Sequence, residues 1–155
     1  MAIEIERKYL LADDSFLALA AESHQIKQGY LCRSPHCTVR VRTWDDKGFV
    51  TIKGKTHNTS RAEYEYEIPL ADAKEMLRTL ATEAIISKTR HIVWHEGNKW
   101  EIDVFGGAIQ GFMLAEIELP SEDHQFAIPP FIGKEVTGDP RYYNSVLATL
   151  TAPPL

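Results

Sequence analysis

Segments in which apolar and charged residues alternate one by one recur along this sequence and constrain its fold more than any other feature. Three examples are 3–6 (Ile-Glu-Ile-Glu), 39–42 (Val-Arg-Val-Arg) and 115–118 (Ala-Glu-Ile-Glu). Successive side chains of a β-strand point to opposite faces of its sheet, so each segment predicts a strand with one apolar and one charged face. An amphipathic helix would instead repeat its apolar residues every three or four positions. The chain is therefore predicted to be mainly β.

Eight strands are predicted from this alternation. Seven alternate clearly, at 3–9, 38–44, 49–55, 61–68, 87–94, 99–105 and 113–119, and a weaker one lies at 25–32. Turn-forming residues at 45–48 and 95–98 predict hairpins between the strands on either side. Because closure into a barrel removes unpaired sheet edges, we expect an eight-stranded antiparallel closed β-barrel.

Three helices are expected beside the strands. Asp13, Asp14 and Ser15 offer an N-cap for a short helix that runs through residue 22. A second helix follows Pro69, where apolar residues recur every three or four positions, and a third begins at Asp139-Pro140. Since 155 residues is the length of one domain, we expect a single domain over 1–155, mainly β with flanking helices (α+β).

Charge and composition exclude several classes of protein. Lys and Arg total 17 against 22 Asp and Glu, a net charge of −5, which argues against a nucleic-acid-binding protein. The N-terminal segment carries acidic residues where a secretion signal needs basic ones, and no run approaches the roughly 18 apolar residues of a membrane span. We therefore expect a soluble cytoplasmic protein with no nucleic-acid or membrane partner.

The charged residues of the predicted strands are segregated by sign. Glu4 lies two residues from Glu6, and Arg40 lies two residues from Arg42, so like charges share a face. Such neighbours repel each other, and an exposed ion pair returns only about 0–1 kcal/mol. The pattern is typical of a site that binds counterions, with divalent cations on the acidic side and a polyanion such as a triphosphate on the basic side. That site requires the charged face to line a cavity, with the apolar face outward beneath the helices, although periodicity alone does not decide which face is inside.

The residues 4–8 (Glu-Ile-Glu-Arg-Lys) fit the pattern Glu-x-Glu-x-Lys, the signature of the triphosphate tunnel metalloenzymes, also called the CYTH superfamily. Further segments resemble that family in the same order along the chain. They are 28–31, 39–42, 51–54, 61–68, 88–90, 102–105, 115–118, and 135–137 with Arg141, Tyr142 and Asn144. The resemblance covers essentially the whole chain and is to the short bacterial members.

This resemblance implies a barrel around a charged tunnel that hydrolyses a triphosphate with Mg²⁺ or Mn²⁺, two ions per site. The implied metal ligands are Glu4, Glu6, Asp103, Glu116 and Glu118. The implied phosphate-binding residues are Lys8, Arg40, Arg42, Lys53, Arg61, Lys88 and Arg90. The candidate catalytic residues are Lys8 as a cation or proton donor, Tyr30 beside it, and Glu63 and Glu65 to orient water or hold a second metal.

Several alternatives stay open at this point. Inorganic tripolyphosphate is the favoured substrate, but class IV adenylate cyclase and thiamine triphosphatase activities also occur in the family that the chain resembles. A non-catalytic polyphosphate-binding module and a barrel with an apolar interior are further possibilities. Tyr30 serves either catalysis or packing. The chain is expected to act as a monomer or homodimer on a small-molecule substrate.

Overall fold

The computed structural model describes residues 3–154, so the first two residues and the last residue of the predicted 1–155 domain lie outside the described part. The strands are β1 (Ile3–Leu11), β2 (Glu22–Arg33), β3 (Cys37–Trp44), β4 (Lys47–Gly54), β5 (Ser60–Ile68), β6 (Ile86–His95), β7 (Asn98–Phe105), β8 (Met113–Glu118) and β9 (Ile132–Glu135). The helical segments are η1 (Ser15–Leu19), α1 (Leu70–Thr79), η2 (Gly107–Ile109), η3 (Pro140–Tyr142) and α2 (Asn144–Leu147).

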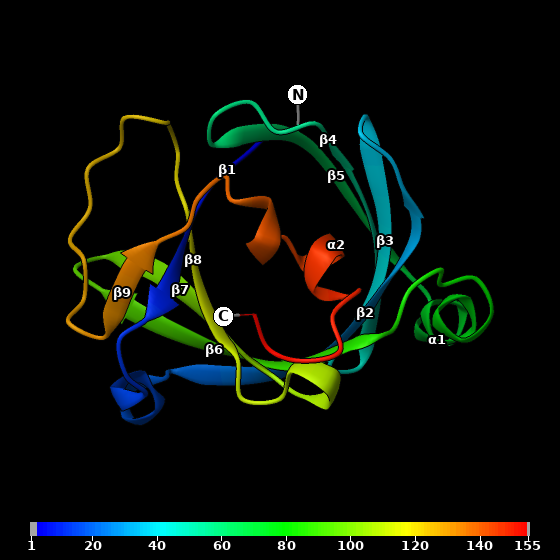
Figure 1. Ribbon diagram of the computed structural model, residues 1–155, viewed down its shortest axis with the longest axis horizontal. Coiled ribbons are helices and arrows are strands. Elements are labelled where there is room, and N and C mark those ends of the chain that lie inside the picture. The colour runs from blue at the N-terminus through cyan, green and yellow to red at the C-terminus, as the bar shows by residue number, and fades with distance from the viewer. Residues whose placement is uncertain (1–2, 155) are drawn as a thin grey trace.

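Eight of the strands close into an antiparallel barrel, which confirms the predicted fold (Figure 1). Their order is β5-β4-β3-β2-β6-β7-β8-β1, and the pairing of β1 with β5 completes the ring. The short strand β9 pairs with the second half of β1 and was not predicted from the sequence. Both predicted hairpins are present, with Asp45 and Glu96 at positive φ in their tight turns.

The register brings the charged side chains to the inside of the barrel. Residues paired across two antiparallel strands point to the same face of the sheet. Glu6 pairs with Glu118, and Lys8 pairs with Glu116, so these four side chains share the inner face of β1 and β8. The intervening residue Ile117 lies on the outer face and is only 1% exposed. The arrangement that the proposed counterion site requires, with the charged face inside the barrel and the apolar face outside, is therefore confirmed.

Apolar side chains on the outer face of β1, β6, β7 and β8 form the main hydrophobic core. Phe16 of η1 belongs to this core together with Trp100, and Phe131, just before β9, and Ile132, the first residue of β9, complete the cover. On the other side of the barrel, α1 packs against β3 and β4. A Cβ atom at Gly48 would lie 2.7 Å from Cβ of Ala73, so glycine at this position lets the helix approach the sheet closely.

Two of the three helix predictions need correction. The segment after Asp13 forms only the 3₁₀ turn η1, because Glu22, expected to end a helix, begins β2 and pairs with Ile92 of β6. The C-terminal helix was expected on the outside of the barrel. Instead η3 and α2 lie within the ring of strands (Figure 1). Leu147 of α2 belongs there to a buried apolar cluster with Phe105, and residues 143–145 line the interior of the barrel.

No helix among the residues 3–154 is both long and apolar enough to cross a membrane.

Candidate active site

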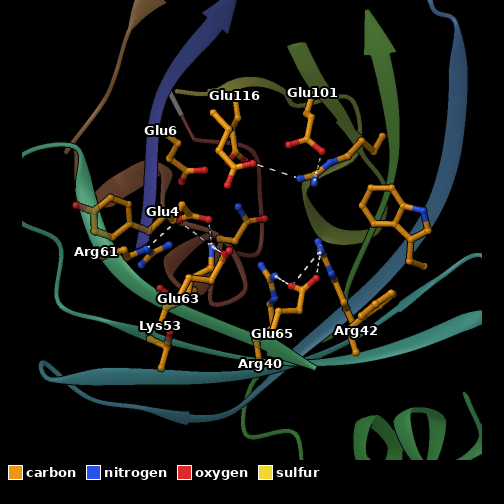
Figure 2. Close-up of a pocket in the computed structure, with 18 of the residues that line it drawn as sticks. Glu4, Glu6, Arg40, Arg42, Lys53, Arg61, Glu63, Glu65, Glu101 and Glu116 are labelled. Atoms are coloured by element: carbon orange, nitrogen blue, oxygen red, sulfur yellow. Dashed lines mark hydrogen bonds and ion pairs between the residues drawn. The ribbon is translucent and has the colours of Figure 1, made fainter. Parts of the chain in front are cut away.

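The barrel encloses a cavity of about 380 Å³ into which side chains from opposing strands point (Figure 2). Its charged lining residues are Glu4, Glu6, Lys8, Arg40, Arg42, Lys47, Lys53, Arg61, Glu63, Glu65, Arg90, Lys99, Glu101, Glu116 and Glu118. Tyr30 also lines the cavity. The structure thus brings together every candidate site residue named from the sequence except Lys88 and Asp103, which do not line it.

One acidic cluster joins Glu4, Glu63 and Glu118, whose nearest carboxylate oxygens all lie within 4.8 Å of one another. Lys53 Nζ lies 3.0 Å from Glu4 Oε2, and Arg61 Nε lies 3.2 Å from Glu4 Oε1. Burial by itself would raise the pKa of Glu4, but the charge of Lys53, a hydrogen bond with Glu63 and the charge of Arg61 lower that pKa to about 2. Burial and the adjacent Glu4 raise the pKa of Glu63 to about 7. Three convergent carboxylates are a donor set that hard divalent cations prefer.

A second acidic pair, Glu6 and Glu116, lies beside Lys8. Lys8 Nζ is 3.8 Å from Glu6 Oε1. Burial and then the charge of Glu116 raise the pKa of Glu6 well above its ordinary value. Burial opposes ionisation of Glu116 as well, but Lys8 holds the pKa of Glu116 well below its ordinary value. Burial and Glu116 thus disfavour the charged form of Glu6, and a cation bound beside this pair would favour it.

The basic side of the cavity is formed by Arg40 and Arg42 on β3. Both approach one carboxylate, that of Glu65, with Nη2 to Oε2 distances of 3.8 Å for Arg40 and 3.3 Å for Arg42. Thr51 donates a 2.7 Å hydrogen bond to the same oxygen of Glu65. Burial, together with Arg40 and Arg90, lowers the pKa of Arg42 to about 10. Two guanidinium groups share one carboxylate, so excess positive charge faces the cavity and suits phosphate oxygens.

Lys88 and Asp103 lie behind this lining, exposed by only 3% and 1%. Asp103 accepts hydrogen bonds from Arg90 Nε at 2.8 Å and Nη2 at 3.0 Å, and Lys88 Nζ lies 2.7 Å from Asp103 Oδ2. Burial lowers the pKa of Lys88 to about 8, against the charge of Asp103. Asp103 therefore faces two cations rather than the other predicted metal ligands. Of its two cationic partners, only Arg90 lines the cavity, so Asp103 is connected to the cavity through Arg90.

The cavity also contains residues that the sequence analysis did not select. Trp44 follows Arg42 by two positions on β3, so alternation could have placed it on the inner face; its ring centroid lies 5.1 Å from the Arg42 guanidinium carbon. Glu101 Oε2 accepts a 3.1 Å hydrogen bond from Arg90. Tyr143 and Asn144 enter the cavity only because the C-terminal segment folds inside the barrel, for which the sequence carries no local signal.

Comparison with known proteins connects this cavity to a family. An inorganic triphosphatase of Acetivibrio thermocellus is 46% identical over 147 residues, covering 95% of this chain and 94% of the relative. An inorganic triphosphatase of Nitrosomonas europaea is 37% identical, covering 94% of this chain and 96% of the relative. The crystal structure of an inorganic triphosphatase superposes with a TM-score of 0.66 at 35% identity, covering 96% of this chain and 95% of that one. The CYTH domain model matches residues 2–143, and with relatives this similar over nearly its full length, the chain belongs to the CYTH domain family.

Proposed function

We propose that this protein hydrolyses the terminal phosphoanhydride bond of inorganic tripolyphosphate with the help of Mg²⁺ or Mn²⁺. The observation that carries the proposal is that one cavity holds convergent carboxylates together with several guanidinium and ammonium groups (Figure 2). A protein that only bound anions would gain nothing from carboxylates in the same cavity, because they repel the ligand. Both relatives described above are named inorganic triphosphatases, which supports the same activity here.

The acidic residues fit divalent cations. Glu4, Glu63 and Glu118 present oxygens within 4.8 Å of one another, and Glu6 with Glu116 forms a second acidic pair. We propose that these two groups hold two metal ions. A metal bound here would neutralise phosphate charge and lower the pKa of a water molecule that attacks phosphorus. Asp103, predicted as a ligand from the resemblance, is better suited to hold Arg90 in position, because both its carboxylate oxygens face Arg90.

The basic residues fit the substrate. We propose that Lys8, Arg40, Arg42, Lys53, Arg61 and Arg90 bind phosphate oxygens and stabilise the charge that develops as the bond breaks. Lys88 acts behind them through Asp103. Glu65, shared by Arg40 and Arg42, is placed to hold these two side chains rather than to orient water. Tyr30 lines the cavity, and it also belongs to the apolar cluster around α2. We propose that its hydroxyl group acts beside Lys8 in addition to this packing.

The size of the cavity favours an inorganic substrate. At about 380 Å³ it lies near the lower end of the range of roughly 300–1,000 Å³ for small-molecule pockets. Tripolyphosphate with its metal ions needs no room for a base, a sugar or a thiazolium ring. A nucleoside triphosphate or thiamine triphosphate would need part of its organic group to lie outside. Tripolyphosphate is therefore preferred to the cyclase and thiamine triphosphatase alternatives.

Phosphate release from tripolyphosphate, ATP and thiamine triphosphate, each with Mg²⁺, with Mn²⁺ and with EDTA, tests this proposal. We expect metal-dependent release, fastest from tripolyphosphate and absent with EDTA. Faster release from either organic triphosphate would replace the proposed substrate. Tight binding of tripolyphosphate without any release would instead favour the non-catalytic binding module.

A further inference from the structure

Tyr143 occupies a position that links the C-terminal segment to the centre of the cavity. It lies between η3 and α2, with an extended backbone (φ −70°, ψ 136°). The residue before it, Tyr142, is buried and stacks on Phe112, with an interplanar angle of 16°. The residue after it, Asn144, accepts hydrogen bonds from Gln28 at 2.9 Å and from Lys88 at 3.0 Å. Anchors on both sides therefore fix where the Tyr143 side chain lies.

The ring of Tyr143 lies next to Lys8, the lysine of the Glu-x-Glu-x-Lys motif. The Lys8 Nζ atom is 5.7 Å from the ring centroid, within the range of a cation–π interaction. Lys8 is buried, with 5% of the residue exposed, and its ion pair with Glu6 is long at 3.8 Å. In the described part of the chain, no hydrogen bond from Lys8 Nζ to another side chain is present. The aromatic ring is thus a contact of this ammonium group beside the carboxylates of Glu116 and Glu6, whose charges outweigh burial and raise the pKa of Lys8.

Tyr143 also borders two spaces that lie beside the charged cavity. It lines the main cavity, a small adjoining one bordered by Thr137 and Gly138, and an open groove bordered by Lys55 and Thr56. Lys8 itself lines the first two of these spaces, so a smaller side chain at position 143 would leave more room for water beside the ammonium group. Contact and exclusion of water both act on the same ammonium group.

We propose that Tyr143 is a positioning residue that holds the Lys8 ammonium group against the substrate phosphates through the face of its aromatic ring. This inference rests on the proposed function, since it concerns how Lys8 takes part in triphosphate hydrolysis. The aromatic face, and not the phenolic hydroxyl, carries the effect. Tyr143 itself acts through Lys8.

The kinetic experiment compares Tyr143→Leu with Tyr143→Phe in tripolyphosphate hydrolysis with Mg²⁺. A cation–π contact of this kind corresponds to a factor of about 3 to 30. We expect Tyr143→Leu to lower kcat by about that factor with a smaller change in KM, because Lys8 assists the reacting phosphate. Tyr143→Phe keeps the ring and should stay within about twofold of the wild type. Tyr66→Leu, which removes an exposed tyrosine on the outside of the barrel, is the matched control and should change neither parameter.

A second measurement tests the contact without using activity. Urea unfolding of the wild type, Tyr143→Leu, Lys8→Met and the double variant gives a double-mutant cycle. We expect Tyr143→Leu to reduce the folding equilibrium constant by about 3- to 30-fold more in the wild-type background than in the Lys8→Met background. If Tyr143→Leu folds poorly, Tyr143→Gln serves in the same cycle, with the same expectation.

The two measurements separate failure of this inference from failure of the proposed function. A wild-type protein that releases no phosphate would overturn the function, while the unfolding cycle would still decide whether Tyr143 and Lys8 are coupled. Equal losses of kcat in Tyr143→Phe and Tyr143→Leu would transfer the role to the hydroxyl and overturn the inference. An unchanged kcat in Tyr143→Leu, or a cycle without coupling, would do so as well.

Discussion

Two clusters of ionisable residues in this barrel are built differently. In the buried one, Asp103 is surrounded by Arg90 and Lys88, and Asn144 adds a hydrogen bond to Lys88. In the open one, carboxylates of β1, β5 and β8 face each other around the cavity, and the nearby cations do not pair with all of them. Burial raises the pKa values of Glu6 and Glu63 there, and that of Glu118, with help from neighbouring carboxylates.

The difference shows which charges serve the fold and which serve a ligand. A buried charge with its partners in place needs nothing from outside, and removing one partner leaves the others uncompensated. Carboxylates that repel each other lower the stability of the folded chain unless a cation binds between them. The buried cluster should therefore respond to mutation mainly through stability, and the open cluster mainly through metal-dependent activity.

Glu6→Gln tests the open cluster and has the largest expected effect. Glutamine cannot supply a negative charge to a metal ion, so we expect the rate of tripolyphosphate hydrolysis with Mg²⁺ to fall by more than about a hundredfold. The free energy of unfolding should stay the same or rise slightly, because burial and the charge of Glu116 both disfavour a charged group at this position and glutamine is neutral. Phosphate release and urea unfolding measure the two quantities.

The matched control is Glu67→Gln. Glu67 continues the alternating charges of β5 but is exposed and does not line the cavity, so its replacement should change neither activity nor stability appreciably. Full activity in Glu6→Gln would remove Glu6 from the proposed metal ligands. A large loss of stability would show that its charge serves the fold after all.

Asp103→Asn tests the buried cluster. The substitution leaves Lys88 and Arg90 without their shared carboxylate, and breaking a buried pair in this way costs about 3–5 kcal/mol. We expect a loss of that size in the free energy of unfolding measured with urea. Asp139→Asn, which breaks the exposed pair with Arg141, should have a much smaller effect. If Asp103→Asn instead kept its stability and lost Mg²⁺ affinity, the ligand role implied by the resemblance would be restored.

The barrel and most of the cavity lining were predictable because alternation in strands has a direct physical meaning. A two-residue period fixes which side chains share a face, so Glu4 with Glu6 and Arg40 with Arg42 could be assigned to one surface. Alternation does not say whether that surface is inside. The family resemblance supplied this choice, and the sign segregation made it physically reasonable.

What the sequence did not provide depends on contacts between distant segments. The helix predicted to begin at Asp139-Pro140 could lie on either side of the sheet, and only packing against Phe105 and Leu114 places this segment inside. Likewise, Asp103 pairs with Arg90 across two strands and therefore lies on the same inner face, yet its short side chain lies behind the lining, covered by Arg90 and Lys88. Alternation along a strand predicts the face on which a side chain lies, but not how far it lies below the cavity surface.

The pH dependence of Mg²⁺ binding gives the smallest effect and the finest test of the contrast between the clusters. Burial and the adjacent Glu4 raise the pKa of Glu63 to about 7, so Glu63 is mostly protonated at pH 6 and mostly ionised at pH 8. A metal ion must displace that proton, and the dissociation constant for Mg²⁺ should therefore be about tenfold higher at pH 6 than at pH 8. Calorimetry at both pH values measures this dissociation constant, and Glu63→Gln should bind Mg²⁺ more weakly and with a smaller dependence on pH.

Asp103, whose pKa stays below its ordinary value because Arg90 and Lys88 outweigh the effect of burial, remains ionised throughout this range and should contribute nothing to the pH dependence. A dissociation constant independent of pH would mean that Glu63 binds no metal, and the open cluster would then consist of the other carboxylates.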